Sequence, residues 1–141
     1  MIAFGIWDIF YYIWLYVMAQ WPESLTTWDL LFYVPLPWVG PVITPILIAL
    51  AMGMAGSFMI YFDNRGYDLR WRCYDTVVEL SCALLMIAAF CWDWKNILQI
   101  PGDIERTGIP NPFAWWLYLP VYLFSIAYFA VRFRQSIRTN H

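Results

Sequence analysis

The sequence predicts an all-α membrane protein whose four transmembrane helices form a bundle, with a short interfacial helix in the first outer loop. Two observations predict this class. Of the 141 residues, 62% are hydrophobic and only 13% are charged, whereas soluble domains have about 25% charged residues. Four apolar stretches, each near the length of about 20 residues that a bilayer-spanning helix needs, take up most of the chain. We therefore expect a single transmembrane domain over residues 1–141.

The expected spans are bounded by proline-rich loops and one capping residue. The first, at 2–19, ends before Pro22, because proline lacks a backbone donor and disfavours helix in the residue before it. The second, at 42–62, follows "PLPWVGP". The third, at 75–94, begins at Asp75, whose carboxylate suits an N-cap. The fourth, at 113–131, follows "GIPNPF" and contains Pro120, where we expect a kink.

Basic residues predict the orientation of these spans. Lys95 and Arg106 lie between spans three and four, and the first loop has no Lys or Arg. The other basic residues lie between spans two and three or after span four: Arg65, Arg70, Arg72, Arg132, Arg134 and Arg138. Because cytoplasmic loops are enriched in Lys and Arg, we expect both termini and the middle loop in the cytoplasm.

A short repeat places a carboxylate directly after a tryptophan. It reads "WDIFYY" at 7–12 and "WDLLFY" at 28–33, and a third Trp-Asp pair stands at 92–93. The amphipathic tryptophan ring is favoured at membrane boundaries, so we expect interface anchors at Trp7, Trp28, Asp29, Trp92 and Asp93. The stretch "SLTTWDLLFYV" is too short to cross and predicts the interfacial helix. A shared binding role for the pairs is the alternative.

Two carboxylates fall inside predicted spans, a turn or so from the cytoplasmic boundary. These are Asp8 and Glu79. A charge in hydrocarbon is costly unless it meets a partner, and Arg72 and Arg132 are the available partners. The sequence therefore predicts an intramembrane charge cluster of these four residues that sets the helix register. A proton or cation site formed by the two carboxylates, or a contact with another polypeptide, is the alternative.

Small residues predict where helices approach closely. In the second span Ala49, Gly53 and Ser57 stand four residues apart on one face. Such a series is typical of tight helix packing in membranes. The partner helix can belong to this chain or to another.

Aromatic residues exceed what a four-span bundle can bury, with ten each of Trp, Tyr and Phe. Many must therefore face lipid, a hydrophobic ligand or neighbouring subunits. The first span has seven of them, spread around the helix: Phe4, Trp7, Phe10, Tyr11, Tyr12, Trp14 and Tyr16.

No cofactor is predicted from the ligating residues. The single histidine, His141, lies outside every span, so a His-ligated haem or chlorophyll is not expected. Cys73, Cys82 and Cys91 have no metal-ligand spacing, and we expect neither a metal site nor a disulfide. A bound lipid, quinone or other hydrophobic pigment remains compatible with the aromatic surplus.

An enzyme is not expected, because no nucleophile and base stand at a recognisable spacing. The loop after span three contains charged residues that suit an ordered cap over the bundle: Asp93, Lys95, Asp103, Glu105 and Arg106. A lipid-active enzyme with this loop as its site is the weakest hypothesis. The formal charge of −2 gives no basic footprint for nucleic acid.

The blocks "WPESLTTWDLLFYVPLPWVGPV" and "CWDWKNIL" resemble pieces of small bacterial inner-membrane proteins of no assigned function. No functional residue is carried over from this resemblance. From this resemblance and the apolar composition together, we expect an integral protein of the bacterial inner membrane. Its expected function is that of an accessory subunit or assembly factor of a larger membrane complex, such as an energy-transducing one, with lipids and other membrane subunits as partners. A minimal oligomeric transporter or channel using Asp8 and Glu79 is the alternative.

Overall fold

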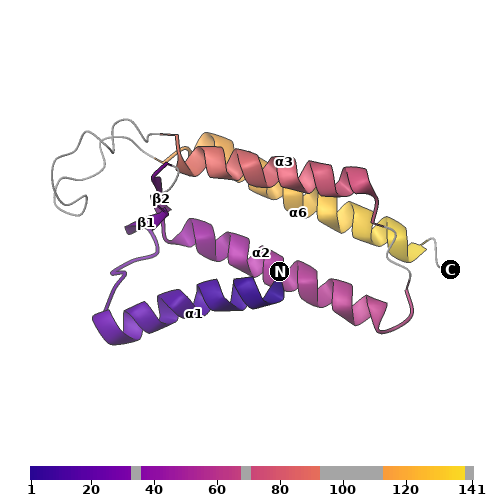
Figure 1. The fold of residues 1–141 in the computed structure, drawn as a ribbon, viewed down its shortest axis with the longest axis horizontal. Helices are drawn as coiled ribbons and strands as arrows, with labels where there is room; N and C mark the ends of the chain where they lie inside the picture. Colours follow the sequence, from indigo (N-terminus) through magenta and orange to yellow (C-terminus); the bar gives the residue numbers. More distant parts are fainter. Residues whose placement is uncertain (33–35, 68–70, 93–112, 139–141) are drawn as a thin grey trace.

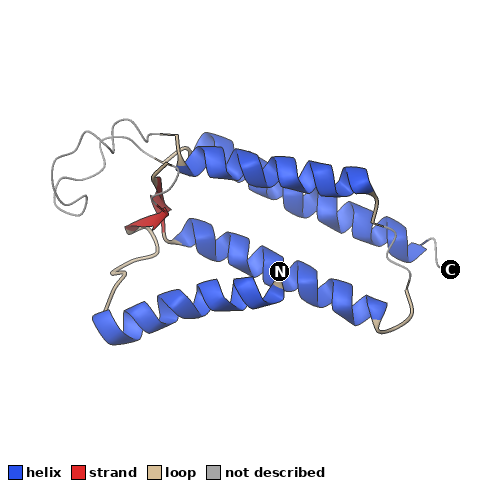
Figure 2. Cartoon of the chain, in the orientation of Figure 1, coloured by secondary structure: helices blue, strands red, loops and turns tan. Residues whose placement is uncertain are grey.

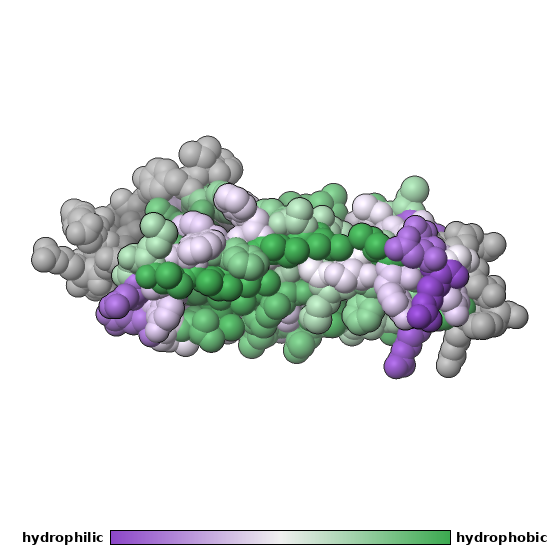
Figure 3. All heavy atoms as spheres, turned by 90° about the horizontal axis from the view of Figure 1, so that it is seen from below, coloured by the Kyte–Doolittle hydropathy of each residue, from purple (hydrophilic) through white to green (hydrophobic). Residues whose placement is uncertain are grey.

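The computed structural model describes residues 1–32, 36–67, 71–92 and 113–138, and it is mostly helical (Figure 1). The helices are α1 (Ile2–Ala19), α2 (Ile43–Asp63), α3 (Cys73–Phe90) and α6 (Trp115–Arg138). All four are long and apolar enough to cross a membrane. On the face shown in Figure 3, hydrophobic residues cover the middle of the molecule and hydrophilic ones gather at its two ends. The chain is thus an integral membrane protein by length and composition of its helices, as the sequence predicts.

The segment between α1 and α2 forms a β-hairpin, and the prediction of a short interfacial helix there is wrong (Figure 2). Strand β1 (Trp28–Phe32) pairs antiparallel with β2 (Trp38–Pro41), with Trp28 opposite Pro41 and Asp29 opposite Gly40. The sequence signal was ambiguous, because a short apolar run with aromatic residues suits either element. Strand pairing favours the hairpin over a helix, because each strand satisfies the backbone N–H and C=O groups of the other. These groups lie close to the apolar zone, where an unpaired backbone group is costly.

Helix α3 begins at Cys73, upstream of the expected start at Asp75. Arg72 is the N-cap residue, and Asp75 is the third residue of the helix. The Asp75 carboxylate reaches back and accepts a hydrogen bond from the backbone N–H of Arg72 at 2.8 Å. A carboxylate in the first turn satisfies a free donor as well as a cap does, which extends the helix in the N-terminal direction.

The helices form a chain of contacts in which α1 packs along α2, α2 touches α6, and α6 packs along α3. Near the hairpin, Tyr118 and Tyr122 of α6 bind carbonyls of α2: their hydroxyls donate to Thr44 O at 2.7 Å and to Leu47 O at 2.9 Å. At the opposite end of α2, the Phe62 ring meets Phe133 of α6 with centroids 5.1 Å apart. These contacts hold the two helix pairs together along their length.

The buried core lies at the hairpin end, where α3 and α6 meet. Trp28 and Trp38 of the hairpin pack against it. Gly40 of β2 lies so close that a Cβ there would come within 2.9 Å of the Phe90 ring, so the strand passes directly over α3. The cluster consists of Met86, Ala89, Phe90, Phe113, Ala114, Tyr118 and Tyr122. The hairpin therefore closes one end of the helix arrangement.

Helix α1 approaches α2 most closely at Gly5, where an added Cβ would stand 2.5 Å from Ala49 O and 3.2 Å from Gly53 N. Ile2 lies beside Gly56, so α1 starts next to the middle of α2 and runs toward the hairpin end (Figure 1). Of the predicted packing face, Ala49 lies against Gly5 of α1, whereas a Cβ at Gly53 would meet nothing within 4 Å and Ser57 is exposed. Ala49 is fully buried, and the Ser57 hydroxyl donates to Gly53 O at 2.8 Å.

Candidate functional site

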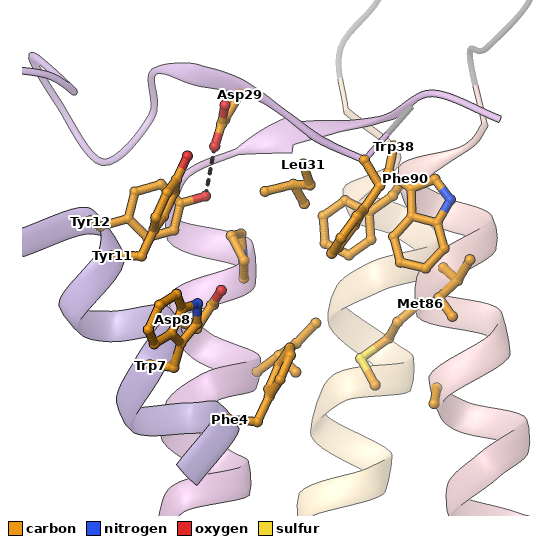
Figure 4. A pocket seen from close by; sticks show the side chains of 15 residues that line it. Phe4, Trp7, Asp8, Tyr11, Tyr12, Asp29, Leu31, Trp38, Met86 and Phe90 are labelled. Carbon is orange, nitrogen blue, oxygen red and sulfur yellow. Dashed lines mark hydrogen bonds between the residues drawn. The ribbon is translucent and has the colours of Figure 1, made fainter. Parts of the chain in front are cut away.

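A cavity of about 430 Å³ lies beneath the hairpin, between α1 and α3 (Figure 4). Phe4, Trp7, Asp8, Tyr11 and Tyr12 of α1 form one wall, and Met86 and Phe90 of α3 stand opposite them. Asp29, Leu31 and Trp38 of the hairpin form its roof, and Pro45 and Ile48 of α2 also line it. We call this space the hairpin cavity. It occupies the position where contact between α1 and α3 would otherwise close the bundle.

The polar groups of the hairpin cavity gather under its roof. The Tyr12 hydroxyl donates to Asp29 Oδ2 at 2.8 Å and joins α1 to β1. Asp8 stands one helical turn from Tyr12 and lines the same cavity. Within the described ranges, the Asp8 carboxylate has no hydrogen-bond or ion-pair partner. The first Lys or Arg of the chain is Arg65, so α1, the hairpin and α2 have no basic side chain.

The position of Asp8 follows from the offset of α1 along α2. The sequence predicts Asp8 and Glu79 at the same depth, a turn or so inside the cytoplasmic boundary. In the structure Asp8 lies near the first turns of α2 and the last turns of α3, at the hairpin end. Glu79 lies in the first half of α3, toward its opposite end. Sequence cannot reveal such an offset, because it depends on where Gly5 meets Ala49.

A second polar group, the Asp75 cluster, consists of Asp75, Tyr128 and Arg132. The Arg132 guanidinium holds the fully buried Asp75 carboxylate at both oxygens, with Nε to Oδ1 at 2.7 Å and Nη2 to Oδ2 at 3.0 Å. The Tyr128 hydroxyl adds a bond to Oδ1 at 2.6 Å. With the Arg72 backbone N–H, the carboxylate accepts four hydrogen bonds. A bidentate, fully satisfied pair of this kind is suited to holding helices in place.

Glu79 is bound on one side only. The Ser125 hydroxyl of α6 donates to its Oε2, whereas Oε1 is buried and has no hydrogen-bond partner in the described part of the chain. Arg72 has an exposed side chain whose guanidinium lies 6.0 Å from the Tyr74 ring centre. The structure therefore does not gather Asp8, Glu79, Arg72 and Arg132 into one cluster.

Asp75 is the acidic residue whose role sequence reasoning missed, because its position near a helix start suggested a cap. The available signal was spacing. Asp75 and Glu79 are four residues apart, on one face of α3. On α6 the polar residues that bind α2 and α3 also recur at helical spacing: Tyr118, Tyr122, Ser125 and Arg132. Two matched polar stripes thus predict the packing of these helices.

The predicted interface anchors differ in surroundings. Trp7 lines the hairpin cavity and is 73% exposed. Trp28 is half-buried with its ring edge-on to Phe113, at a centroid distance of 6.2 Å. Trp92 is exposed and packs edge-on against Trp116 at 5.0 Å. Asp29 binds Tyr12, as described above. Asp93 lies outside the described residues, as do Lys95, Asp103, Glu105 and Arg106 of the same loop.

Large side chains form a continuous row along one exposed face of α1, and the first three of them border the hairpin cavity. Other exposed aromatic residues of this helix, Phe10 and Tyr16, lie outside the row, in line with the aromatics that the sequence places all around the helix. Successive members are three or four residues apart, the spacing of one helix face. All are exposed, and Trp7, Tyr11 and Trp14 make no hydrogen bond within the described ranges. The row, which we call the α1 stripe, consists of Phe4, Trp7, Tyr11, Trp14 and Met18.

No group of three or more His, Cys, Asp or Glu side chains that could hold a metal ion occurs among the described residues. No family model, no curated protein and no solved structure matches the chain. The candidate sites therefore rest on the geometry of this chain alone.

Proposed function

We propose that the protein is a small integral membrane subunit that docks on a larger membrane complex as an accessory or assembly factor. The observation that carries the proposal is the α1 stripe, a row of large side chains along a transmembrane helix that no other helix of the described chain covers. Its proposed occupant is a transmembrane helix of a partner subunit.

The composition of the stripe favours protein over lipid as its neighbour. On lipid-facing helices, Trp and Tyr gather at the two membrane boundaries. Here Tyr11 lies near the middle of the 18-residue helix, and Trp7 and Trp14 flank it. Their polar N–H and O–H groups find no acceptor in hydrocarbon, whereas a partner helix can supply one. Trp and Tyr are also the residues most enriched at the centres of protein interfaces.

The spacing of the stripe favours a helical partner. Rows at intervals of three and four residues form the seam along which two helices interlock. Within the chain α1 packs chiefly along α2, and Gly5 and Tyr12 are its buried residues. The proposed setting is the bacterial inner membrane with both termini in the cytoplasm, and a multisubunit energy-transducing complex is the partner class that we favour.

The test is affinity purification of the full chain, with a C-terminal tag, in a mild detergent, followed by mass spectrometry of the co-purified subunits. Trp14 and Met18 are the positions to change, because they belong to the stripe and do not line the hairpin cavity. We expect stoichiometric larger membrane subunits with the wild type and their loss from the double variant Trp14→Ala/Met18→Ala.

Leu80→Ala/Leu84→Ala is the matched control, since both leucines are exposed, one turn apart, on α3. It should retain the partner. A photo-crosslinking residue at position 14 should capture the same subunit, and one at position 84 should not. Purification of the wild type as a homo-oligomer without other subunits would refute the proposal.

The alternative, a minimal oligomeric transporter, has one observation in its favour: the unpaired Asp8 carboxylate in the hairpin cavity. Reconstitution in liposomes with a proton or sodium gradient tests it. Asp8→Asn and Glu79→Gln should both abolish ion flux while the proteins remain folded. If the wild type shows no ion flux, the transporter function is refuted and the docking proposal is unaffected.

A further inference from the structure

We infer that the hairpin cavity binds an amphipathic ammonium cation, a positively charged amine head attached to an apolar body. The two carboxylates under the roof would receive the head, and the apolar walls of α2 and α3 would receive the body. Phe4, Trp7 and Tyr11 belong to both the α1 stripe and the cavity wall, whereas Asp29 and Ala83 line the cavity and lie outside the stripe. Variants at Asp29 and Ala83 therefore test this inference separately from a docked subunit.

Size and lining are those of a ligand site. The volume of about 430 Å³ lies within the range of about 300–1,000 Å³ typical of small-molecule pockets. Such sites combine mostly apolar walls with a few converging polar groups. Here the apolar walls include Ile48, Met86 and Ile87, and the polar groups are confined to the α1 and hairpin side.

The negative charge of the cavity lining favours a cationic ligand. Asp8 and Asp29 line one cavity, and no basic side chain of the described ranges pairs with either. The buried Tyr12 hydroxyl fixes Asp29 but brings no positive charge. Two uncompensated carboxylates beside the apolar zone are costly, and a bound ammonium group relieves that cost.

Aromatic side chains next to the carboxylates indicate that the cation is an ammonium group attached to an organic body. Phe4, Trp7 and Tyr11 border the cavity on the side of Asp8 (Figure 4). Faces of such rings attract ammonium groups within about 6 Å, most strongly where water is excluded. A hydrated metal ion would gain nothing from these rings or from the apolar walls.

Two sources can supply this chemistry: the headgroup of an amine-bearing membrane lipid, or a free lipophilic amine. Both place the positive charge between Asp8 and Asp29 and an apolar chain along α3. The experiment is arranged to distinguish them.

The full chain, purified in an uncharged maltoside detergent, is titrated with dodecyltrimethylammonium by equilibrium dialysis. We expect saturable binding of one cation per chain. Because loss of a charged partner changes a binding constant by about tenfold or more, Asp8→Asn/Asp29→Asn should weaken binding by at least that factor. Asp63→Asn, a carboxylate at the opposite end of α2 and outside the cavity, is the matched control and should bind as the wild type does.

A second pair of variants tests the volume without touching a charge. Ala83 lines the cavity from α3, so Ala83→Phe should fill it and abolish saturable binding. Ala88 is exposed on the same helix and does not line the cavity, so Ala88→Phe should leave binding unchanged. This pair keeps the inference testable if the double carboxylate variant fails to fold.

Lipids extracted from the purified protein reveal the source. Phosphatidylethanolamine retained by the wild type and lost from Asp8→Asn/Asp29→Asn identifies a lipid headgroup, and none retained while the probe binds identifies a free amine. The inference is overturned if the wild type shows no saturable binding, or if Ala83→Phe binds as tightly as the wild type. It is also overturned if Lys95→Gln/Arg106→Gln raises the probe affinity, since the chain would then supply the cation itself.

Discussion

Asp75 on α3 and Arg132 on α6 form a bidentate ion pair across 57 residues of sequence, with Nε and Oδ1 2.7 Å apart. The carboxylate is fully buried, and the Arg132 side chain is 18% exposed. The pair fixes α6 against the first turn of α3, at the end of the molecule opposite the hairpin. Because every polar group of the carboxylate is engaged, its role is to set the register of the two helices.

Arg132→Met should destabilise the protein strongly, because it leaves a buried carboxylate with no countercharge. We expect the thermal unfolding midpoint in detergent to fall by roughly 5–10 °C. Asp75→Asn/Arg132→Met, which removes both charges, should recover part of this loss. A midpoint for Arg132→Met equal to that of the wild type would show that the ion pair does not hold α3 to α6.

Gly5→Ala should loosen α1 from α2, because the new Cβ would stand 2.5 Å from the backbone carbonyl of Ala49, which cannot rotate away. Overpacking of this kind typically costs about 1–3 kcal/mol in unfolding free energy. Gly53→Ala is the matched control, since nothing lies within 4 Å of its Cβ position. It should be neutral or stabilising by up to about 1 kcal/mol. Unfolding midpoints in one detergent compare the two, and equal effects would contradict the close approach.

Tyr118→Phe should lower the unfolding free energy by about 1 kcal/mol, the usual contribution of one hydrogen bond. The ring stays in the core, and only the bond from the hydroxyl to Thr44 O is lost. Tyr16→Phe is the control, because Tyr16 is exposed and no hydrogen bond to its hydroxyl occurs in the described chain. If the two variants unfold at the same temperature, the bond from α6 to α2 contributes nothing.

Glu79→Leu should be neutral or stabilising, because it removes the buried Oε1 that has no partner in the described chain. Ser125→Ala should be destabilising by roughly 1–2 kcal/mol, since it deprives Glu79 of its donor while the carboxyl stays in place. Chemical unfolding of both variants measures the difference. The opposite order would indicate that Glu79 makes an interaction essential to the fold.

Cys73 should resist a membrane-impermeant thiol reagent applied to intact cells, because we expect the loop before α3 to be cytoplasmic. The thiol is exposed, so it should react at once after the membrane is opened. Cys91, at the hairpin end, is replaced by Ser in this experiment. Burial raises the pKa of the Cys91 thiol, which slows its labelling and would blur the comparison. Rapid labelling of Cys73 from outside would reverse the proposed orientation.

The length of the apolar stretches was enough to predict the fold class, whereas the contacts between the spans could not be predicted from the sequence. The four helices could be predicted because about 20 apolar residues in a row have few alternatives in a bilayer. The β-hairpin could not, since "WDLLF" suits a strand or a helix equally until "WVGP" pairs with it.

The candidate site shows the same division. The small residues Ala49, Gly53 and Ser57 predict a close approach of two helices, but neither the partner residue, Gly5, nor the offset between the helices. That offset places Asp8 at the hairpin end, and the packing of α6 on α3 separately pairs Arg132 with Asp75. Charge pairing between spans therefore follows from packing and cannot be read from the depth of each residue in its own span.

The hairpin between α1 and α2 has a consequence for the order of events during biosynthesis. Its residues leave the ribosome before α3 and α6, yet Trp28 packs against Phe113 and Gly40 against Phe90. The two strands consequently lack their apolar packing partners until the last span has entered the bilayer. The hairpin end can therefore be completed only after the later spans have been inserted.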